Sequence, residues 1–183
     1  MGVVEQSHNP TIMDKTTTDR FEQLSQVFRS GATRDPDYRI ESLRRLEKYI
    51  RVHENDIARA LWEDLRKSPE EAYLTETGIV LGEIRTQIKN IRKWTRPQRK
   101  RSPLFLFPSK SRILYEPKGV VLIIAPWNYP FQLLFDPLVG AVAAGNCVAL
   151  KPSTTSASTC AVMKKIISEA FPQEMAAFFD GDH

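Results

Sequence analysis

The polar residue Asn128 stands in a stiff, apolar setting where its side chain could do chemistry. It lies in the sequence Ala-Pro-Trp-Asn-Tyr-Pro, between Pro126 and Pro130. A carboxamide held on a stiff loop is a neutral donor of the kind that stabilises an oxyanion, provided that it is fixed before the charge develops. The alternative is an asparagine that only satisfies its own turn. The residues alone leave both interpretations of Asn128 open.

Lys151 is the second candidate, because it directly follows a short apolar run and is stiffened by Pro152. At the carboxyl end of a buried strand, a lysine can reach the hydroxyls or phosphate of a nucleotide that lies across the edge of the sheet. The alternative is a surface lysine whose stem covers apolar neighbours. On this residue alone, the surface lysine is the favoured interpretation.

Other reactive side chains give weaker signals. Neither Cys147 nor Cys160 has a base or a cation nearby in the sequence that would activate its thiol, so a structural role is favoured for both. The three histidines are far apart in the sequence, and we predict neither a catalytic triad nor a metal site from them (His8, His53 and His183).

The usual glycine motifs for phosphate binding are missing. None of the eight glycines are two residues apart, so the sequence has no G-x-G-x-x-G fingerprint. Gly140 and Gly145 have the spacing of a P-loop, but Asn146-Cys147 follows where Lys and Ser or Thr are required. Close packing and a helix-ending turn explain these glycines better.

A strand-helix-strand unit is predicted to position Asn128 and Lys151. Val120–Ile124 is a wholly apolar run rich in β-branched residues, which is typical of a strand buried on both faces. Phe131–Ala144 is long enough for a helix, and Cys147–Leu150 is a second apolar run. Such a unit predicts parallel strands, with both candidate residues at the edge where open α/β sheets bind ligands.

The chain continues in the same pattern and begins with helices. Another helix over about Ala157–Ala170 and a third buried strand over Met175–Phe179 extend the parallel sheet, with right-handed crossovers. The polar residues 1–16 predict a flexible tail. Asp19 and Glu22 resemble a capping box that opens a helix through about Ser30.

Two further helical stretches are predicted before the sheet. Asp35-Pro36 begins one, with a break near His53–Asn55. Ser68-Pro69 begins another, which should run to about Trp94. Gly78 and Gly82 lie on one face of that helix, where we expect the backbone of another element to approach closely.

A basic stretch and a hairpin link the helices to the sheet. Lys89–Arg101 carries seven basic residues, which could form a nuclear signal or a patch for nucleic acid or anionic lipid. A solvated helix end followed by an exposed linker is favoured, because the run is short and has little aromatic interleaving, so we expect no nucleic-acid partner. Ser102–Pro108 and Arg112–Tyr115 are predicted as short strands joined by a turn.

The overall composition is that of a soluble globular protein. The 183 residues are 42% apolar and 26% charged, which suffices for one domain with a core. The net charge of +4 allows an anionic partner without arguing for one. No apolar run reaches about 18 residues, so no transmembrane segment is predicted. Two cysteines without metal-type spacing suit a reducing, cytoplasmic location.

The sequence resembles the aldehyde dehydrogenase superfamily, most closely its class 3 or fatty-aldehyde-dehydrogenase-like branch. Pro-Trp-Asn-Tyr-Pro, then Pro137, then Ala-Ala-Gly-Asn-Cys-Val-Ala-Leu-Lys-Pro-Ser follow in the family's order and spacing. Phe28-Arg29-Ser30-Gly31 and Asp64-Leu65-Arg66-Lys67-Ser68 resemble the family's N-terminal helices. The resemblance therefore covers roughly residues 20–183.

The resemblance implies an α/β fold and a reaction. Residues 17–183 would form N-terminal helices followed by an incomplete, parallel-sheet Rossmann-like domain that binds NAD or NADP. Residues 99–116 would start a β-hairpin arm used for oligomerisation. In the family, a cysteine thiolate attacks the aldehyde, hydride passes to the nicotinamide cofactor, and a glutamate-activated water hydrolyses the thioester.

The resemblance also implies roles for individual residues. Asn128 would supply the side-chain half of the oxyanion hole, Lys151 would bind the adenosine ribose, and Tyr129 would lie near the substrate. The other implied cofactor-binding positions are Ile124, Ala125, Pro126, Trp127, Ser153 and Thr154.

Thr154 departs from many members of the family, which have Glu at this position to hold the ribose hydroxyls. A carboxylate repels a 2′-phosphate, whereas a hydroxyl can donate a hydrogen bond to it. With Lys151 nearby, we expect NADP to be accepted at least as well as NAD.

The sequence ends at His183, before the family's glycine-bearing cofactor loop, general-base glutamate and nucleophilic cysteine. We therefore expect an N-terminal fragment or a truncated product that is inactive alone and aggregates or is molten, because its sheet keeps an open edge. The complete protein would be a homodimer or homotetramer that oxidises an apolar aliphatic or aromatic aldehyde. The alternative is a non-catalytic remnant that acts as a binding module.

Overall fold

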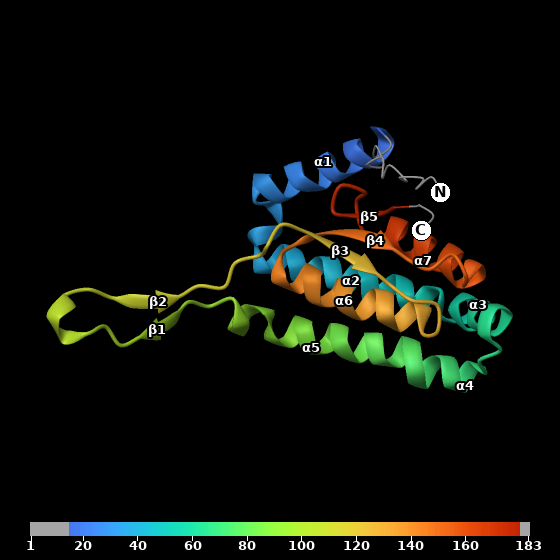
Figure 1. Ribbon diagram of the computed structural model, residues 1–183. Helices are drawn as coiled ribbons and strands as arrows, with labels where there is room; N and C mark the ends of the chain where they lie inside the picture. Colours follow the sequence, from blue (N-terminus) through green and yellow to red (C-terminus); the bar gives the residue numbers. More distant parts are fainter. Residues whose placement is uncertain (1–14, 180–183) are drawn as a thin grey trace, which may run out of the picture.

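A computed structural model of the protein describes residues 15–179 (Figure 1). Helices fill the first half, and a parallel sheet with its crossover helices fills the second. The α-helices are α1 (Lys15–Ser30), α2 (Pro36–Val52), α3 (Glu54–Leu65), α4 (Pro69–Ala72), α5 (Gly78–Trp94), α6 (Pro130–Ala144) and α7 (Ala157–Ala170). The strands are β1 (Gln98–Lys100), β2 (Ser111–Ile113), β3 (Val120–Ile124), β4 (Cys147–Lys151) and β5 (Ala176–Phe178). The remaining helical turns are η1 (Ala32–Arg34), η2 (Tyr73–Thr77) and η3 (Leu104–Leu106).

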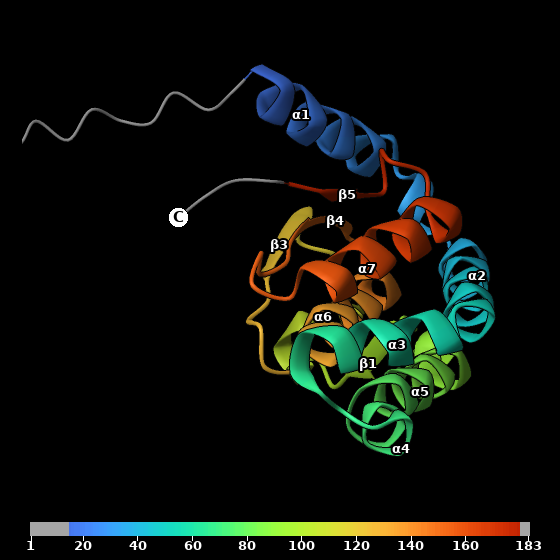
Figure 2. The same cartoon turned by 90° about the vertical axis from the view of Figure 1, so that its right-hand side faces the viewer.

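The elements form layers around the sheet, as the end-on view of Figure 2 shows. Helices α6 and α7 cover one face of the sheet, and α1 lies across the other. A further layer of α2, α3 and α5 packs on α6 and α7, so these two helices are enclosed. The main core lies between the helices and contains the stacked rings of Phe131 and Phe135, whose centroids are 4.3 Å apart. The predicted α/β architecture with N-terminal helices and a parallel sheet is confirmed.

The sheet has the strand order β3-β4-β5, and all of its strands are parallel. The central strand β4 is buried on both faces, as its apolar run requires. The same expectation is wrong for β3, because Ile123 is buried against the helices while Leu122 and Ile124 are 58% and 62% exposed. Strand β3 lies at an edge, and α1 packs only near its beginning, at Val120.

Helix α1 begins earlier than expected. Asp19 and Glu22 lie inside α1, which starts at Lys15, so the predicted capping box does not open this helix. Lys15 and Thr16 are helical rather than part of a tail, and the rest of the predicted tail lies outside the described residues. The predicted break near His53–Asn55 is confirmed, since α2 ends at Val52 and α3 begins at Glu54.

The helical stretch from Ser68 to Trp94 is continuous but contains a π-helical turn, η2. The Ser68 side chain caps its start by accepting a hydrogen bond from the Glu71 N–H, as predicted. Gly78 is tight against its own helix, because an added Cβ would lie 2.7 Å from the Tyr73 carbonyl. Gly82 faces open space. The expected close approach of another element at these glycines is therefore wrong.

The hairpin arm projects from the body of the protein (Figure 1). Its strands β1 and β2 pair antiparallel, with Arg99 opposite Arg112. The predicted strand at Ser102–Pro108 is wrong: this apolar segment forms the turn η3 at the tip, and the polar residues Gln98–Lys100 form the strand instead. The tip side chains Leu104, Phe105 and Phe107 are more than 80% exposed.

Candidate active-site loop and cofactor groove

The two strands that precede Asn128 and Lys151 end side by side. Ile124 of β3 pairs with Lys151 of β4, and the Ala125 N–H donates to the Lys151 carbonyl over 3.1 Å. The loop from Ala125 to Tyr129 and the loop from Lys151 to Thr154 therefore leave the same edge of the sheet. Parallel sheets bind ligands at this side, where the carboxyl ends of the strands lie.

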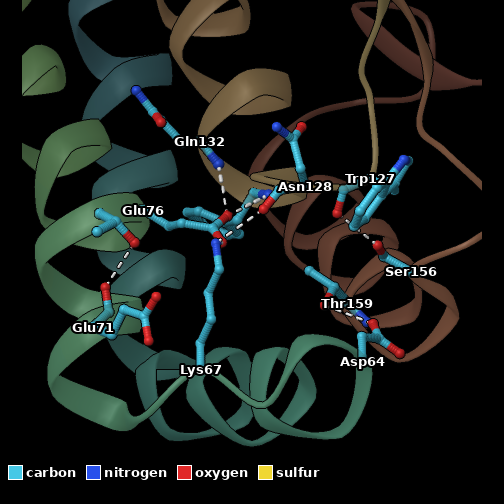
Figure 3. A network of polar contacts seen from close by, with 11 residues as sticks. Asp64, Lys67, Glu71, Glu76, Trp127, Asn128, Gln132, Ser156 and Thr159 are labelled. Carbon is cyan, nitrogen blue, oxygen red and sulfur yellow. Dashed lines mark hydrogen bonds and ion pairs between the residues drawn. The ribbon is translucent and has the colours of Figure 1, made fainter.

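The Asn128 carboxamide is exposed and makes no hydrogen bond within residues 15–179, whereas its backbone carbonyl accepts one from Lys67 over 3.0 Å. In Figure 3 the side chain points away from Lys67. The carboxamide thus does not satisfy its own turn among the described residues. Its N–H groups are available to an external acceptor on a loop whose backbone is held in place.

Lys67 and Glu76 form a buried ion pair beneath this loop, and sequence reasoning missed both residues. Lys67 is 7% exposed and Glu76 is fully buried, and Lys67 Nζ lies 2.6 Å from Glu76 Oε1. The ammonium also lies 3.8 Å from the centroid of the Tyr129 ring, a cation–π contact. Lys67 therefore contacts Asn128 and its acidic partner Glu76 (Figure 3), and it also contacts Tyr129.

The second oxygen of Glu76 holds the start of α6. Glu76 Oε2 accepts hydrogen bonds from the N–H groups of Phe131 and Gln132 at 2.8 and 3.2 Å. The first N–H groups of a helix lack intrahelical partners, and the helix dipole favours negative charge at this end. Glu76, from a distant helix, thus caps α6 in the place of a local residue.

Asp64 caps α7 in the same way. Its carboxylate accepts hydrogen bonds from the N–H groups of Ser158 and Thr159, at 3.2 and 2.7 Å, and from the Thr159 hydroxyl at 2.8 Å. The buried Ser156 hydroxyl donates to the Trp127 carbonyl over 3.0 Å, which joins the loop after β4 to the loop after β3. Both loops are therefore tied to the N-terminal helices and to each other (Figure 3).

A groove of about 330 Å³ lies beside the loop after β4. Its walls come from that loop, from α7 and from the end of the sheet, and its lining residues are Pro152, Thr154, Ala157, Cys160, Ala161, Lys164 and Phe179. The surface is mainly apolar, with the exposed Thr154 hydroxyl at one side. The groove can take a flat apolar group that carries hydroxyls or a phosphate at its edge.

The other proposed cofactor-binding residues differ in how exposed they are to solvent and in whether their polar groups are already hydrogen-bonded. Ile124, Pro126 and Trp127 are exposed at the ends of the strands, whereas Ala125 is buried with its N–H already bonded. Lys151 is half-buried at the end of β4. The Ser153 hydroxyl accepts a hydrogen bond from the N–H of Thr155 over 3.3 Å, which shapes the loop next to the groove.

Cys147 does not have the setting of an activated nucleophile. Cys147 is fully buried between the sheet and α1, and desolvation by burial raises the pKa of its thiol to about 11. Cys160 is half-buried on α7 and lines the groove. The structural role favoured for Cys147 fits its burial.

Comparison with known proteins gives this geometry its context. Residues 10–183 match the aldehyde dehydrogenase family. The chain belongs to the aldehyde dehydrogenase family. It is 44% identical over 162 residues to 4,4'-diaponeurosporen-aldehyde dehydrogenase of Staphylococcus aureus, a match that covers 88% of this chain and 35% of the relative. It is 39% identical over 155 residues to aldehyde dehydrogenase family 3 member B1 of Mus musculus, covering 85% of this chain and 32% of the relative.

Solved structures agree in fold. The substrate-bound state of Staphylococcus aureus AldH has a TM-score of 0.88 at 43% identity, covering 90% of this chain and 36% of that chain. A betaine aldehyde dehydrogenase of Staphylococcus aureus in complex with NAD+ has a TM-score of 0.77 at 25% identity, covering 91% and 33%. The chain spans about a third of the length of the relatives that it matches. The predicted membership, close to class 3, is confirmed.

Residues 15–179 contain neither a candidate membrane-spanning helix nor a candidate metal site. No helix there has both the length and the apolar character needed to cross a bilayer. No three His, Cys, Asp or Glu side chains of the same segment are grouped as ligands of a metal ion would be.

Proposed function

We propose that the chain is the N-terminal part of an NAD(P)-dependent aldehyde dehydrogenase and contributes one oxyanion donor and the adenosine side of the cofactor site. Family membership supports the reaction class. The observation that carries the proposal is the Asn128 carboxamide, which is exposed, has no hydrogen-bond partner among residues 15–179, and lies on a loop that the N-terminal helices hold. An oxyanion donor needs this combination of availability and rigidity.

Asn128 acts on the aldehyde oxygen in this proposal. When a thiolate attacks the carbonyl carbon, the carbonyl π electrons move to the oxygen, which becomes an oxyanion. The Asn128 N–H group donates to that oxygen and lowers the free energy of the transition state. We assign neither the thiolate nor the general base to a residue of this chain, and Cys147 in particular is buried and un-ionised at neutral pH.

The groove beside α7 fits the adenosine end of a dinucleotide. Its mainly apolar surface suits an adenine ring. In this proposal, the Thr154 hydroxyl in the groove and the Lys151 ammonium at the neighbouring end of β4 hold the ribose hydroxyls or a 2′-phosphate. When bound, NAD or NADP supplies the hydride acceptor. Thr154 can donate to a 2′-phosphate, so we propose that NADP is used at least as well as NAD.

The substrate and the assembly are part of the same proposal. Trp127 and Tyr129 are 53% and 39% exposed beside Asn128, so aromatic surface faces the reacting aldehyde, which suits an apolar aliphatic or aromatic substrate. The arm formed by β1 and β2 exposes apolar side chains at its tip, which supports a homodimer or homotetramer assembled through it. We propose a cytoplasmic location.

The test uses a full-length form, meaning the product of the complete gene or, if the gene ends at His183, a chimera. In the chimera, residues 1–183 are followed by the part of the Staphylococcus aureus relative that the match leaves uncovered. Asn128→Ala should lower kcat about 100-fold to 1,000-fold, the usual effect of losing one oxyanion donor. The matched control is Asn90→Ala, which removes a half-buried asparagine of α5 whose amide donates to the Thr86 carbonyl over 2.8 Å, outside the loop that carries Asn128. An unchanged kcat in Asn128→Ala would contradict the proposed role.

A further inference from the structure

The buried pair of Lys67 and Glu76 makes directional hydrogen bonds to the backbone at Asn128 and at the start of α6. We propose that Lys67 and Glu76 are positioning residues that set the direction of the Asn128 carboxamide and thereby act on kcat. This inference rests on the proposed oxyanion role of Asn128. The hydrogen bond from the pair to Asn128 goes to its backbone carbonyl, so in this proposal the pair acts on the substrate through Asn128.

Lys67 holds the peptide group between Asn128 and Tyr129 in place. Its Nζ donates to the Asn128 carbonyl over 3.0 Å and lies under the Tyr129 ring, 3.8 Å from the centroid. A single backbone rotation relates this carbonyl to the Cα–Cβ bond of the same residue. Holding the carbonyl therefore limits the directions in which the carboxamide can point.

Glu76 holds the first turn of α6, which directly follows the loop. One oxygen pairs with Lys67 at 2.6 Å, and the other accepts from the N–H groups of Phe131 and Gln132. The same carboxylate therefore connects the lysine under Asn128 to the first turn of α6. Two residues that are almost completely buried therefore hold the chain at the Asn128 carbonyl and at the helix start that follows it.

A local irregularity of the helix brings Glu76 to this place. Glu76 lies in the π-helical turn η2, which is closed by a hydrogen bond from the Gly78 N–H to the Tyr73 carbonyl. A π turn inserts a residue into a helix and shifts the face that its side chains occupy, and such turns are frequent at functional sites. Any side chain at Gly78 would meet the Tyr73 carbonyl at 2.7 Å.

Stability alone is a weak reason for such a pair. Removing two charges from water costs free energy, and apolar residues of similar volume are often as stabilising as a buried ion pair. The Lys67 and Glu76 pair instead gives directional hydrogen bonds to one carbonyl and two N–H groups. Directional contacts are what a preorganised donor requires, because a misplacement of about 1 Å can cost about 100-fold in rate.

The experiment is a double-mutant cycle in the full-length form, with kcat for an apolar aldehyde and cofactor affinity as the readouts. Lys67→Met should lower kcat about 10-fold to 100-fold, with cofactor affinity nearly unchanged. In the Asn128→Ala background, the same substitution should change kcat less than about threefold, because the residue through which it acts is gone. Glu76→Gln keeps the volume and should give the same pattern if Lys67→Met fails to fold.

Arg39→Met is the matched control. Arg39 is also a buried cation that donates to backbone carbonyls, those of Thr33, Arg34 and Ala143, but these lie away from the loop that carries Asn128. It should lower the midpoint of thermal unfolding without lowering kcat of the folded protein. A loss of kcat equal to that of Lys67→Met would show a general effect of destabilisation and would overturn the inference.

The outcomes separate the two proposals. If Asn128→Ala leaves kcat unchanged, the oxyanion role fails and the positioning role fails with it. If Asn128→Ala lowers kcat but Lys67→Met and Glu76→Gln do not, only the positioning role fails. If the losses for Lys67 and Asn128 multiply in the double variant, the two residues act independently and the inference is also wrong.

Discussion

The Cys147 thiol is fully buried, so it should resist alkylation in the folded protein, and the rate of that reaction tests its burial quantitatively. Burial raises the pKa of this thiol to about 11, compared with 9.0 for an ordinary cysteine. At pH 8 about one thiol in 1,000 is then ionised, compared with about one in ten for the ordinary case, and only the thiolate reacts. Ionisation alone therefore slows alkylation of Cys147 about 100-fold. The absence of exposed surface on Cys147 slows it further.

The assay is alkylation of the full-length form with iodoacetamide, followed by digestion and mass spectrometry of the peptide that carries each cysteine. Cys160, which is half-buried at the groove, provides the comparison within the same protein. The rate at Cys147 should rise about tenfold per pH unit from pH 8 to pH 10, because the thiol pKa lies above this range. In denaturant both cysteines should react at similar rates.

The same experiment tests the view that Cys147 is not a nucleophile. Cys147→Ala should leave kcat unchanged and lower the free energy of unfolding by about 1 kcal/mol through lost packing. Alkylation of Cys147 as fast as that of Cys160 in the folded protein would refute the argument from burial. So would a rate at Cys147 that levels off near pH 9, or a large loss of activity in Cys147→Ala.

Three further predictions concern the cofactor, pH and the isolated chain. Thr154→Glu should lower kcat/KM for NADP about tenfold through repulsion of the 2′-phosphate and spare NAD; a strong NAD preference before substitution would contradict the role of Thr154. Burial, together with repulsion from the Glu83 carboxylate, raises the pKa of the Asp136 carboxyl above its ordinary value of 3.8. Ionising this buried group costs free energy in the folded state, so the free energy of unfolding falls as the pH rises from 3.8 through the raised pKa. Asp136→Asn should therefore raise the free energy of unfolding at pH 7 but not below pH 3.8, as measured by urea titration. Residues 1–183 alone should form no NAD(P)H with aldehyde and should aggregate, given the exposed Leu122 and Ile124; a reversible two-state melt of a monomer would argue otherwise.

The sheet and its crossover helices were predictable because their signals are local. Cys147–Leu150 is a continuous apolar run that ends at a lysine and a proline, and the structure has β4 at Cys147–Lys151. The helix expected over Phe131–Ala144 is α6, which ends at Gly145 in the left-handed conformation that favours glycine. In both cases the residues that define the element lie within the element.

The arm and the edge strand of the sheet were predicted less well, because their structure depends on contacts with other parts of the chain. Ser102–Pro108 is apolar enough for a strand, but it has no partner to pair with and forms the tip of the arm. The polar segment Gln98–Lys100 pairs because β2 lies opposite. Leu122 and Ile124 have the composition of buried strand residues, yet nothing within residues 15–179 covers them.

The support beneath Asn128 could not be found from the sequence for a related reason. Glu76 contacts backbone N–H groups 55 and 56 residues further along the chain. Its inward orientation depends on a π turn, and the turn breaks the helical period by which a buried face is recognised. The sequence shows only a charged residue in a helix, and most such residues face solvent.

The caps on α6 and α7 have a consequence for how this fold can hold a nucleotide. In many α/β proteins, phosphate groups bind at the N-terminus of the helix that follows a parallel strand, and glycines allow the close approach. Here the carboxylates of Glu76 and Asp64 already accept hydrogen bonds from those N–H groups and would repel a phosphate. In the proposed cofactor complex, we therefore expect the pyrophosphate to lie away from both helix ends. A glycine-rich turn after β3 or β4 would then have no phosphate group to bind. This is consistent with the absence of a glycine-rich phosphate-binding motif from this sequence.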